Sequence, residues 1–294
     1  MLPKPIIGGN FFTALETVLG SSSGRGHFND GDLQYAALKL PAAMLIVRRT
    51  AEELFSATVA REQASSKLFA VINGNMWNVT TAGKLNAFSG HDPVPAGETT
   101  PMGQVIVSGQ MVDGTPEPNR FFALFGSFFN SPPRTTESMY EFDKGNPSSL
   151  AMSAVGGLGP LILKRLKFGH QNLYDPKVPP GAPVQGEPGP AHLPFLVQRN
   201  NMTYIAMAAR GLRTGKVAMA IHRASSILLL LVQPDGAPTG ISLDMLRDKL
   251  FDVGVDDAVF LDGSDSAMLV VNGVFHVSQG EDKDELTTIG LGFR

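Results

Sequence analysis

The residues best suited to chemistry stand together near the C-terminus, in segment 258–273, which reads AVFLDGSDSAMLVVNG. An apolar run ends at Asp262, and Gly263 then lets backbone amides approach a ligand closely. The same turn carries two hydroxyls and a second carboxylate, on Ser264, Ser266 and Asp265. Such a turn can bind an anionic or polyhydroxylated ligand, with Asp262 as nucleophile, base or electrostatic stabiliser. Taken alone, Asp-Gly is more often a tight turn whose carboxylate bonds its own backbone.

A second candidate is the turn Asn73-Gly74-Asn75, which follows an apolar run at 68–72. At the tip of a strand, an asparagine amide can bond a sugar hydroxyl or a phosphate, and glycine leaves room for it. The competing interpretation is an ordinary hairpin turn, the usual role of Asn-Gly.

Two basic side chains could complete a phosphate site. The planar guanidinium of Arg210 can donate two charge-assisted hydrogen bonds to a phosphate, although an arginine at a strand end is also a common surface residue. His222 could act as an acid or base, but a lone histidine at a strand end is more often a hydrogen-bonded structural residue.

A divalent cation is a further candidate ligand. Asp256 and Asp257 precede Asp262 and Asp265, and their oxygens could hold calcium or magnesium. The spacing lacks the alternating acidic ladder of a calcium loop, so solvated carboxylates are the alternative for Asp256 and Asp257. The sequence leaves the metal open.

The surrounding pattern indicates many strands and few helices. Helical spacing of apolar residues predicts helices at 11–19 and 51–63, and a third that begins after Ser242. Apolar runs predict the remaining elements as strands, at 68–72, 104–112, 120–125, 204–209, 217–222, 227–232 and 258–261. Asn272-Gly273 predicts a two-residue hairpin turn. Seven prolines make 175–194 a long loop, lid or linker.

The order of these segments resembles the phosphodiester glycosidase family. Segment 258–273 resembles its signature, in which an apolar strand ends in Leu-Asp-Gly-Gly-Gly-Ser and a hairpin follows. Segments 70–77 and 156–162 resemble its Ile-Asn-Gly-Gly-Phe-Phe and Gly-Pro-Leu elements, and 240–246 resembles the helix start before the signature. The resemblance runs from about Lys67 to the C-terminus.

The resemblance implies an α+β fold, a mixed β-sheet with packed helices. It places a site at strand ends around Asn73, Gly157, Arg210 and Asp262. It divides the chain into an N-terminal extension, 1–66, packed on a phosphodiester glycosidase-like domain, 67–294. The implied activity is hydrolysis of the bond between a sugar's anomeric carbon and a phosphodiester, on a small molecule or a glycan.

Departures from the family pattern keep two other functions open. The family has an Arg-Thr-Ala element before the turn that is Gly215-Lys216 here, so its arginine is either shifted to Arg210 or absent. His222-Arg223 replaces an Asp-Gly, and Ser264 and Asp265 interrupt the run of glycines. The alternatives are a diverged module that binds a glycan or sugar phosphate, and an exported effector or interaction protein.

The composition limits the kinds of binding partner that we expect for this chain. A net charge of −3 gives no general attraction to nucleic acid or to an anionic membrane. The longest aliphatic run, 227–232, is far too short to span a bilayer. The absence of cysteine excludes disulfides and thiolate chemistry.

The first residues lack a conventional signal peptide, so a cytoplasmic location is the default expectation, with non-classical export as the alternative. The sequence does not indicate the oligomeric state.

Overall fold

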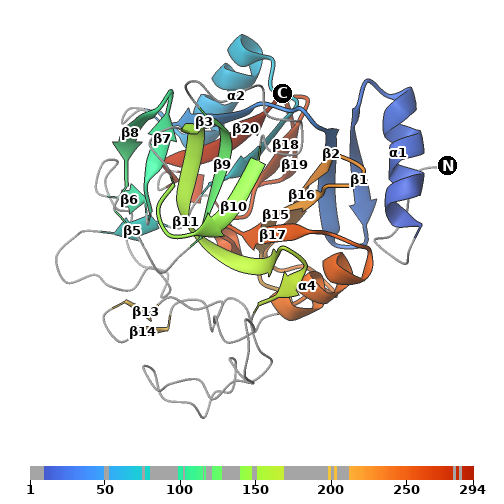
Figure 1. The fold of residues 1–294 in the computed structure, drawn as a ribbon. Coiled ribbons are helices and arrows are strands. Elements are labelled where there is room, and N and C mark those ends of the chain that lie inside the picture. Colours follow the sequence, from blue (N-terminus) through green and yellow to red (C-terminus); the bar gives the residue numbers. More distant parts are fainter. Residues whose placement is uncertain are drawn as a thin grey trace. The chain divides into compact units, whose positions relative to one another are not determined.

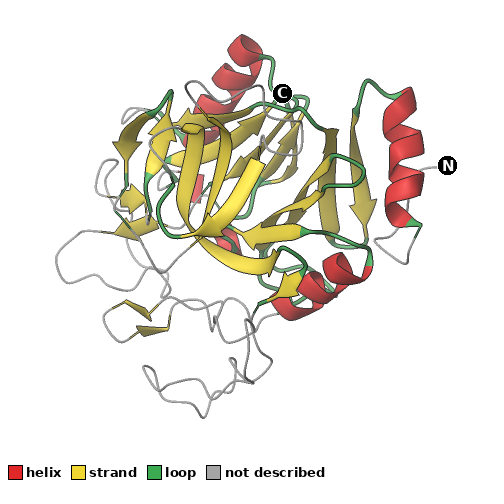
Figure 2. Ribbon diagram, in the orientation of Figure 1, coloured by secondary structure: helices red, strands yellow, loops and turns green. Residues whose placement is uncertain are grey.

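A computed structural model describes residues 10–49, 53–74, 77–79, 99–101, 103–114, 116, 121–127, 140–147, 151–168, 198–199, 202–203, 212–280, 283–284 and 287–294. The chain forms two compact units, each built from two stretches of sequence. Unit 1 comprises Met1–Leu40 and Gly159–Ser264, and unit 2 comprises Pro41–Leu158 and Asp265–Arg294. Strands dominate the described part of both units, with three α-helices (Figures 1 and 2), so the fold is α+β.

Unit 1 contains α1 (Phe11–Ser21), β1 (Arg25–Asp30), β2 (Leu33–Lys39), β12 (Leu166–Lys167), β13 (Gln198–Arg199), β14 (Met202–Thr203), β15 (Lys216–His222), β16 (Ile227–Gln233), α4 (Leu243–Asp252) and β17 (Asp257–Phe260). Unit 2 contains β3 (Met44–Arg48), α2 (Phe55–Ser66), β4 (Ala70–Asn73), β5 (Trp77–Val79), β6 (Thr99–Pro101), β7 (Val105–Val107), β8 (Gln110–Asp113), β9 (Phe121–Ser127), β10 (Tyr140–Lys144), β18 (Leu269–Val271), β19 (Val274–Val277) and β20 (Ile289–Phe293). The long strand β11 (Ala151–Leu163) and the short 3-10 helix η4 (Ser264–Ser266) have residues in both units.

The sheet of unit 1 has the order β1-β2-β16-β15-β17-β11, with antiparallel neighbours throughout. Its central strands are buried along their whole length, except for His222 at the end of β15, which is half-buried. This burial on both faces explains the continuous apolar sequence of β16, ILLLLVQ, where a half-exposed strand would alternate. Figure 1 shows β15, β16 and β17 side by side.

The helix α1 covers part of this unit, as the helical spacing of its apolar residues predicts. Phe11, Phe12, Leu15 and Leu19 are all buried. Phe11 contacts Tyr35 of β2, with the ring centroids 6.1 Å apart. The first forty residues therefore contribute a helix and two paired strands to the core of unit 1.

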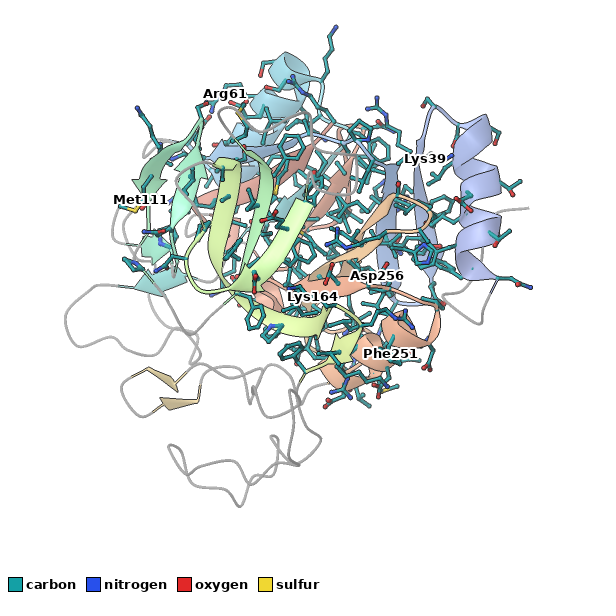
Figure 3. The ribbon with its side chains drawn as sticks, in the orientation of Figure 1. Lys39, Arg61, Met111, Lys164, Phe251 and Asp256 are labelled. Carbon is teal, nitrogen blue, oxygen red and sulfur yellow. The ribbon has the colours of Figure 1, made fainter. Side chains whose placement is uncertain are left out.

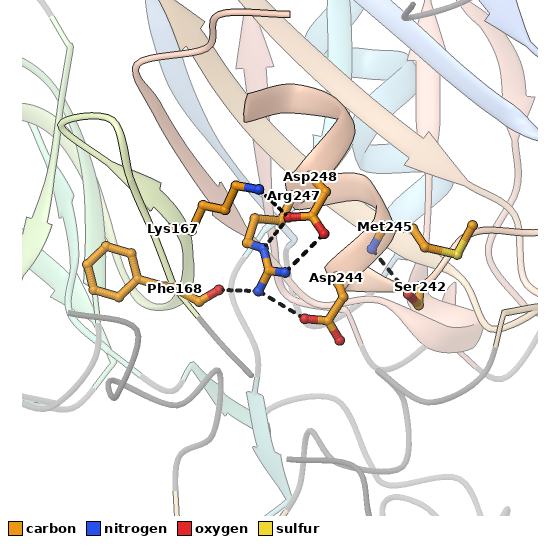
Figure 4. Close-up of polar contacts among 7 residues, drawn as sticks. All are labelled: Lys167, Phe168, Ser242, Asp244, Met245, Arg247 and Asp248. Atoms are coloured by element: carbon orange, nitrogen blue, oxygen red, sulfur yellow. Dashed lines mark hydrogen bonds and ion pairs between the residues drawn. The ribbon is translucent and has the colours of Figure 1, made fainter. Parts of the chain in front are cut away.

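The helix α4 is fixed at its start and along its buried face. The Ser242 hydroxyl accepts a hydrogen bond from Met245 N at 3.2 Å, which confirms the predicted cap. The buried Arg247 guanidinium donates to the Phe168 carbonyl at 2.8 Å and pairs with Asp244 at 3.0 Å (Figure 4). Lys167 pairs with Asp248 at 2.9 Å in the same cluster. These bonds attach α4 to the end of β12.

Unit 2 contains a five-stranded antiparallel sheet of order β19-β18-β4-β20-β3. The helix α2 packs on it through Phe55 and Val59, which share a core cluster with Val71 and Val270. This helix begins at Phe55, four residues later than the predicted start, and Asp284 accepts a hydrogen bond from Ser56 N at 2.6 Å in its first turn.

In the rest of unit 2, the first half of β11 pairs with β7 and β9, which pair in turn with β8 and β10, and β5 pairs with β6 in a separate two-stranded sheet. The apolar run at 104–112, predicted as one strand, forms the hairpin β7–β8 instead. Ser108 and Gly109 both have positive φ at its turn. The predicted turn at Asn272-Gly273 is confirmed, since both residues have positive φ and β18 pairs with β19 around them.

Two predicted segments, the strand at 204–209 and the Pro/Gly-rich loop at 175–194, lie outside the described residues. Among the helices of the described part, none combines the length and apolar character needed to cross a membrane.

Candidate functional site

Asp262 follows β17, a central strand of unit 1, with Leu261 between them. Leu261 N donates to Val217 O at 2.9 Å, so the pairing of β17 with β15 continues past Phe260. The four residues of β17 are buried, whereas Asp262 is only half-buried. The apolar strand thus fixes the backbone of Asp262 and leaves its carboxylate partly accessible.

Gly263 makes a close backbone contact inside this unit. A Cβ added at Gly263 would lie 2.6 Å from Gly215 O and 3.5 Å from the Lys216 Cα. Any larger residue would push apart the two turns that carry Asp262 and Lys216. Steric contact with the protein itself therefore explains this glycine without a ligand.

The strand register brings a lysine opposite Asp262. Ala218 pairs with Phe260 in the antiparallel pair β15–β17, so stepping two residues along each strand places Lys216 opposite Asp262. On the other side of β15, Lys216 pairs with Gln233 of β16. Because cross-strand partners project from the same face of a sheet, Gln233 and Lys216 lie on one face at the end of β15 and β16, whereas Asp262 lies in the bend that follows β17.

The turn before Lys216 is held by buried hydrogen bonds. Gln233 is fully buried, and its Nε2 donates to Leu212 O at 2.8 Å and to Thr214 O at 2.7 Å. Its Oε1 accepts from Ile241 N at 2.7 Å. Lys216 Nζ also donates to Thr214 O. These contacts anchor the turn to β16 and to the segment that leads into α4.

Lys216 is 3% exposed, which is unusual for a lysine. Burial lowers the pKa of its ammonium to about 8, while the Asp235 carboxylate opposes that effect. The sequence interpretation treated Lys216 only as part of a turn. The available signal was a lysine that opens an otherwise apolar strand, KVAMAIH.

His222 lies at the other end of β15, and the structure does not bring it to Asp262. Six residues of extended strand separate His222 from Lys216, about 20 Å. The imidazole stacks on Phe12 with the ring centroids 3.8 Å apart, and Nδ1 is 2.6 Å from Ser225 Oγ. Burial lowers the pKa of His222, with a smaller effect in the same direction from Arg165, while Asp256 and Glu16 oppose both.

The two aspartates considered as metal ligands stand at the start of β17, whereas Asp262 follows its end. Arg223 N donates to Asp256 Oδ2 at 2.7 Å, and Arg223 Nε donates to Asp257 Oδ2 at 2.9 Å (Figure 3 labels Asp256). Lys164 N donates to the other oxygen of Asp257 at 2.7 Å. Within the described ranges, no group of three or more His, Cys, Asp or Glu residues is arranged to hold a metal ion.

In unit 2, Asn73 and Gly74 lie at the end of β4 and have structural contacts. Asn73 is 1% exposed, and its Oδ1 accepts from Met268 N at 3.0 Å. A Cβ on Gly74 would lie 2.7 Å from Ile289 O. Both residues therefore join β4 to neighbouring chain segments.

The second half of the signature is also held within unit 2. Asp265 O accepts from Gly280 N at 2.9 Å, and the Asp265 carboxylate lies 3.4 Å from Lys283 Nζ. Ser266 is buried, and its carbonyl accepts from Gln279 at 3.0 Å. Gly157 has a φ of 75° in β11. A Cβ on Gly103 would lie only 2.2 Å from Gly157 N.

Three predicted site residues have less description. Arg210 and Asn75 lie outside the described residues, and Ser264 is described only as part of the backbone of η4. Of the remaining candidates, Asp262, Gly263 and His222 belong to unit 1, and Asn73, Gly74, Gly157, Asp265 and Ser266 belong to unit 2.

A model of the phosphodiester glycosidase family matches residues 66–290. No curated protein sequence matches closely enough to count as a relative. Among solved structures, the catalytic domain of zebrafish N-acetylglucosamine-1-phosphodiester alpha-N-acetylglucosaminidase, auto-inhibited by its pro-peptide, is similar to this chain. It has 14% identity and a TM-score of 0.51, over 92% of this chain and 81% of the zebrafish chain. A protein from Burkholderia pseudomallei is similar at 13% identity and a TM-score of 0.51, over 89% of this chain and 73% of its own.

Proposed function

Because this chain belongs to the phosphodiester glycosidase family, we propose that it hydrolyses a glycosyl phosphodiester and that Asp262 is the catalytic carboxylate. The observation that carries the proposal is the position of Asp262. It is the first carboxylate after the apolar run of the signature-like segment 258–273, and it is half-buried just past the end of the buried strand β17.

The reaction breaks the bond between the anomeric carbon and the phosphate oxygen. Water supplies a hydroxyl to the anomeric carbon, and its second proton leaves with the phosphate or to solvent, so the products are a free sugar and a phosphate monoester. The transition state carries positive charge on the sugar ring, which a nearby carboxylate stabilises either through space or by forming a covalent intermediate. Phosphate is already a good leaving group, so a second carboxylic acid is not required.

The contacts within each unit refine which signature residues face a substrate. Asn73, Asp265 and Ser266 are bonded to protein groups, so we assign them to holding the second half of the signature within unit 2. We assign Asp262 and the backbone of Gly263 and Ser264 to the ligand because of their place in the acidic, glycine-containing turn of the signature. Arg210 remains the proposed clamp for the phosphate, on the basis of sequence alone.

The test is hydrolysis of a panel of sugar-1-phosphodiesters, including UDP-N-acetylglucosamine, by the wild type and by Asp262→Asn. The panel is assayed with and without divalent metal. We expect the wild type to turn over at least one substrate and Asp262→Asn to be about 100-fold slower or worse. Asp256→Asn, at the other end of β17, is the matched control and should retain turnover.

Full turnover by Asp262→Asn would remove the catalytic assignment. An absence of turnover on every substrate, with a sugar phosphate still bound, would overturn the hydrolase proposal in favour of a binding module. Arg210→Lys should weaken phosphate binding, because an ammonium cannot replace a bidentate guanidinium. Unchanged binding would show that Arg210 does not bind the phosphate.

A further inference from the structure

The turn between β11 and β12 carries a guanidinium that is held in place but has no carboxylate partner. Lys164 and Arg165 form this two-residue turn with φ of 49° and 63°, positive values that such turns usually take from asparagine and glycine. The Arg165 guanidinium donates to Val255 O at 3.1 Å and lies over the ring of Phe251, 4.9 Å from its centroid (Figure 3 labels Lys164 and Phe251). Among the described residues, no carboxylate forms an ion pair with Arg165. Its other N–H groups are therefore available to a ligand.

The imidazole of His222 presents a second N–H donor close to this guanidinium. Its Nδ1 accepts a hydrogen bond from Ser225 N at 3.3 Å and is 2.6 Å from Ser225 Oγ. A ring nitrogen that accepts from a backbone N–H carries no proton, so the neutral imidazole is protonated at Nε2. Stacking on Phe12 fixes the plane of the ring. In the part of the chain that the structure describes, Nε2 has no hydrogen-bond partner.

The two donors converge over Gly254. A Cβ added at Gly254 would lie 3.5 Å from His222 Nε2 and 3.6 Å from Arg165 Nη1, with no described atom closer apart from those of Gly254 and its chain neighbours. The φ of Gly254, 101°, explains why this residue is glycine. Its missing side chain leaves an open space between the donors, in which one oxygen atom could accept from both.

We propose that Arg165 and His222 form a binding site for a small oxyanion of the phosphate class over Gly254. The donors come from two segments, the β11–β12 turn and the end of β15, and a tetrahedral anion has enough oxygens to accept from both. Protein contacts hold both side chains before a ligand arrives, so binding has little ordering cost.

This site is separate from the proposed catalytic carboxylate. Gly254 precedes β17, whereas Asp262 follows the end of that strand, about 20 Å away along extended chain. An anion over Gly254 is therefore not the phosphodiester that Asp262 is proposed to cleave. The inference does not depend on the proposed function, and each can fail without the other.

Charged groups from neighbouring segments of unit 1 act on His222. Burial has the largest effect on its pKa and lowers it, with a smaller effect in the same direction from Arg165, while Asp256 and Glu16 oppose both. The Asp256 carboxylate accepts from Arg223 N at 2.7 Å, which offsets part of its charge. An anion beside Nε2 favours the protonated ring, so binding should tighten as the pH falls. Because the two carboxylates weaken the attraction for an anion, we expect an affinity in the millimolar range.

Titration of the full chain with sodium sulfate at constant ionic strength tests the site without any substrate. The His222 ring nitrogens are followed by NMR between about pH 5 and about pH 8, a range in which sulfate keeps its charge and only the protein titrates. We expect a saturable change in the Nε2 resonance and binding that is tighter at the lower pH by about threefold or more.

Three variants assign the donors. Arg165→Gln should weaken sulfate binding by about tenfold or more, because a charge-assisted donor is lost. Lys164→Gln is the matched control, since it removes the same charge one residue away in the same turn, and it should retain most of the affinity. His222→Gln should bind sulfate more weakly than the wild type and without the dependence on pH.

The wild-type titration decides the proposal even if a variant does not fold. No saturable change at His222 with either sulfate or inorganic phosphate would overturn it, as would equal losses of affinity in Arg165→Gln and Lys164→Gln. Glycerol 3-phosphate and inorganic phosphate, compared in the same titration, distinguish the sources of the anion. Tighter binding of glycerol 3-phosphate would support the site and identify an organic phosphate as its ligand, and tighter binding of inorganic phosphate would support it as a site for the free anion.

Discussion

At the scale of single residues, the acidic and polar side chains of the signature have different surroundings. Asp262 follows a buried strand and remains half-buried, whereas Asp265 lies beside Lys283 and Ser266 is buried. Asn73 is buried and accepts a backbone hydrogen bond. A polar residue that already has a protein partner gains little by exchanging it for a ligand, because the original partner would lose its own bond. Asn73, Asp265 and Ser266 therefore have structural roles, and Asp262 remains the proposed catalytic carboxylate because of its place in the signature.

The surroundings of His222 predict a structural role that depends on pH. Burial lowers the pKa of His222 below its ordinary value of 6.5, so the folded protein binds the proton less readily than the unfolded chain. The unfolding free energy should therefore fall as the pH drops below 6.5, and the contribution of His222 should be fully present above that pH.

The variant His222→Gln tests this, since glutamine can still bond Ser225 but does not titrate. The unfolding free energy of the wild type, relative to His222→Gln, should decrease between pH 7 and pH 5 in urea titrations. A difference in stability that does not change with pH would show that His222 is not held neutral by the fold.

The buried charge that the sequence did not reveal is Lys216, for a physical reason. Its burial depends on the pairing of β15 with β16 and with β17, and β17 is far from β15 in sequence. Periodicity and motif spacing describe local neighbours, so they indicate Asp262 as a candidate but do not indicate that Lys216 is buried. The same limit applies to His222. Sequence patterns did not show that it lies at the end of β15 away from Lys216 and from the turn that carries Asp262.

At the scale of elements, the contact between the Gly263 turn and the turn before Lys216 sets the geometry of the candidate site. Gly263→Ala would bring a methyl group to 2.6 Å from Gly215 O. Because a backbone carbonyl cannot rotate away, the two turns must separate, at a cost of about 1–3 kcal/mol, and turnover should fall with the displaced Asp262.

Gly20→Ala is the control for that substitution. Gly20 lies in α1 with nothing within 4 Å of an added Cβ, so alanine should stabilise the helix by about 0.5–1 kcal/mol. Thermal unfolding and steady-state kinetics on both variants measure the contrast. If Gly263→Ala unfolds at the wild-type temperature and turns over normally, the close contact does not govern the site.

The cluster around Arg247 predicts which ion pairs hold α4. Arg247→Met removes the pair with the buried Asp244 and the bond to Phe168 O, which should lower the unfolding free energy by about 3–5 kcal/mol. Asp244→Asn combined with Arg247→Met should recover part of this loss. Lys167→Met is the matched control, because its pair with Asp248 is exposed, and it should cost under about 1 kcal/mol. Equal losses from Arg247→Met and Lys167→Met, measured by urea unfolding, would contradict the assignment.

Elements with strong local signals were predicted well from the sequence. Three such signals depend only on neighbours along the chain: the apolar spacing of α1, the Ser242 cap and the turn at Asn272-Gly273. The prediction of one strand at 104–112 was wrong because it gave more weight to the apolar residues than to Ser108-Gly109, a dipeptide typical of turns, at which both residues adopt positive φ. For 204–209 and 175–194, the predictions stay predictions.

At the scale of the whole molecule, the chain enters each compact unit more than once. Unit 1 needs Met1–Leu40, which precede unit 2 in sequence, and the crossings fall at Leu40, inside β11 and inside the signature. The family match begins at residue 66, so its region does not include β1 and β2. A boundary at residue 66 would therefore divide unit 1 between an extension and a domain.

Truncation tests whether the first forty residues are an accessory or part of the fold. Strand β2 pairs with β16 along six residues, from Ile227↔Lys39 to Val232↔Gln34. A variant that begins at residue 41 would leave β16, all of whose residues are buried, as an open apolar edge. Such an edge pairs with other chains, so we expect this variant to aggregate and to lose its near-ultraviolet circular dichroism.

A variant that begins at residue 67 also lacks β3 and α2, which pack in unit 2, and should be still less stable. If the variant that begins at residue 67 is soluble, monodisperse on gel filtration and unfolds at the temperature of the full chain, residues 1–66 are a true extension. Aggregation of both variants would make β1 and β2 structural requirements of the sheet of unit 1.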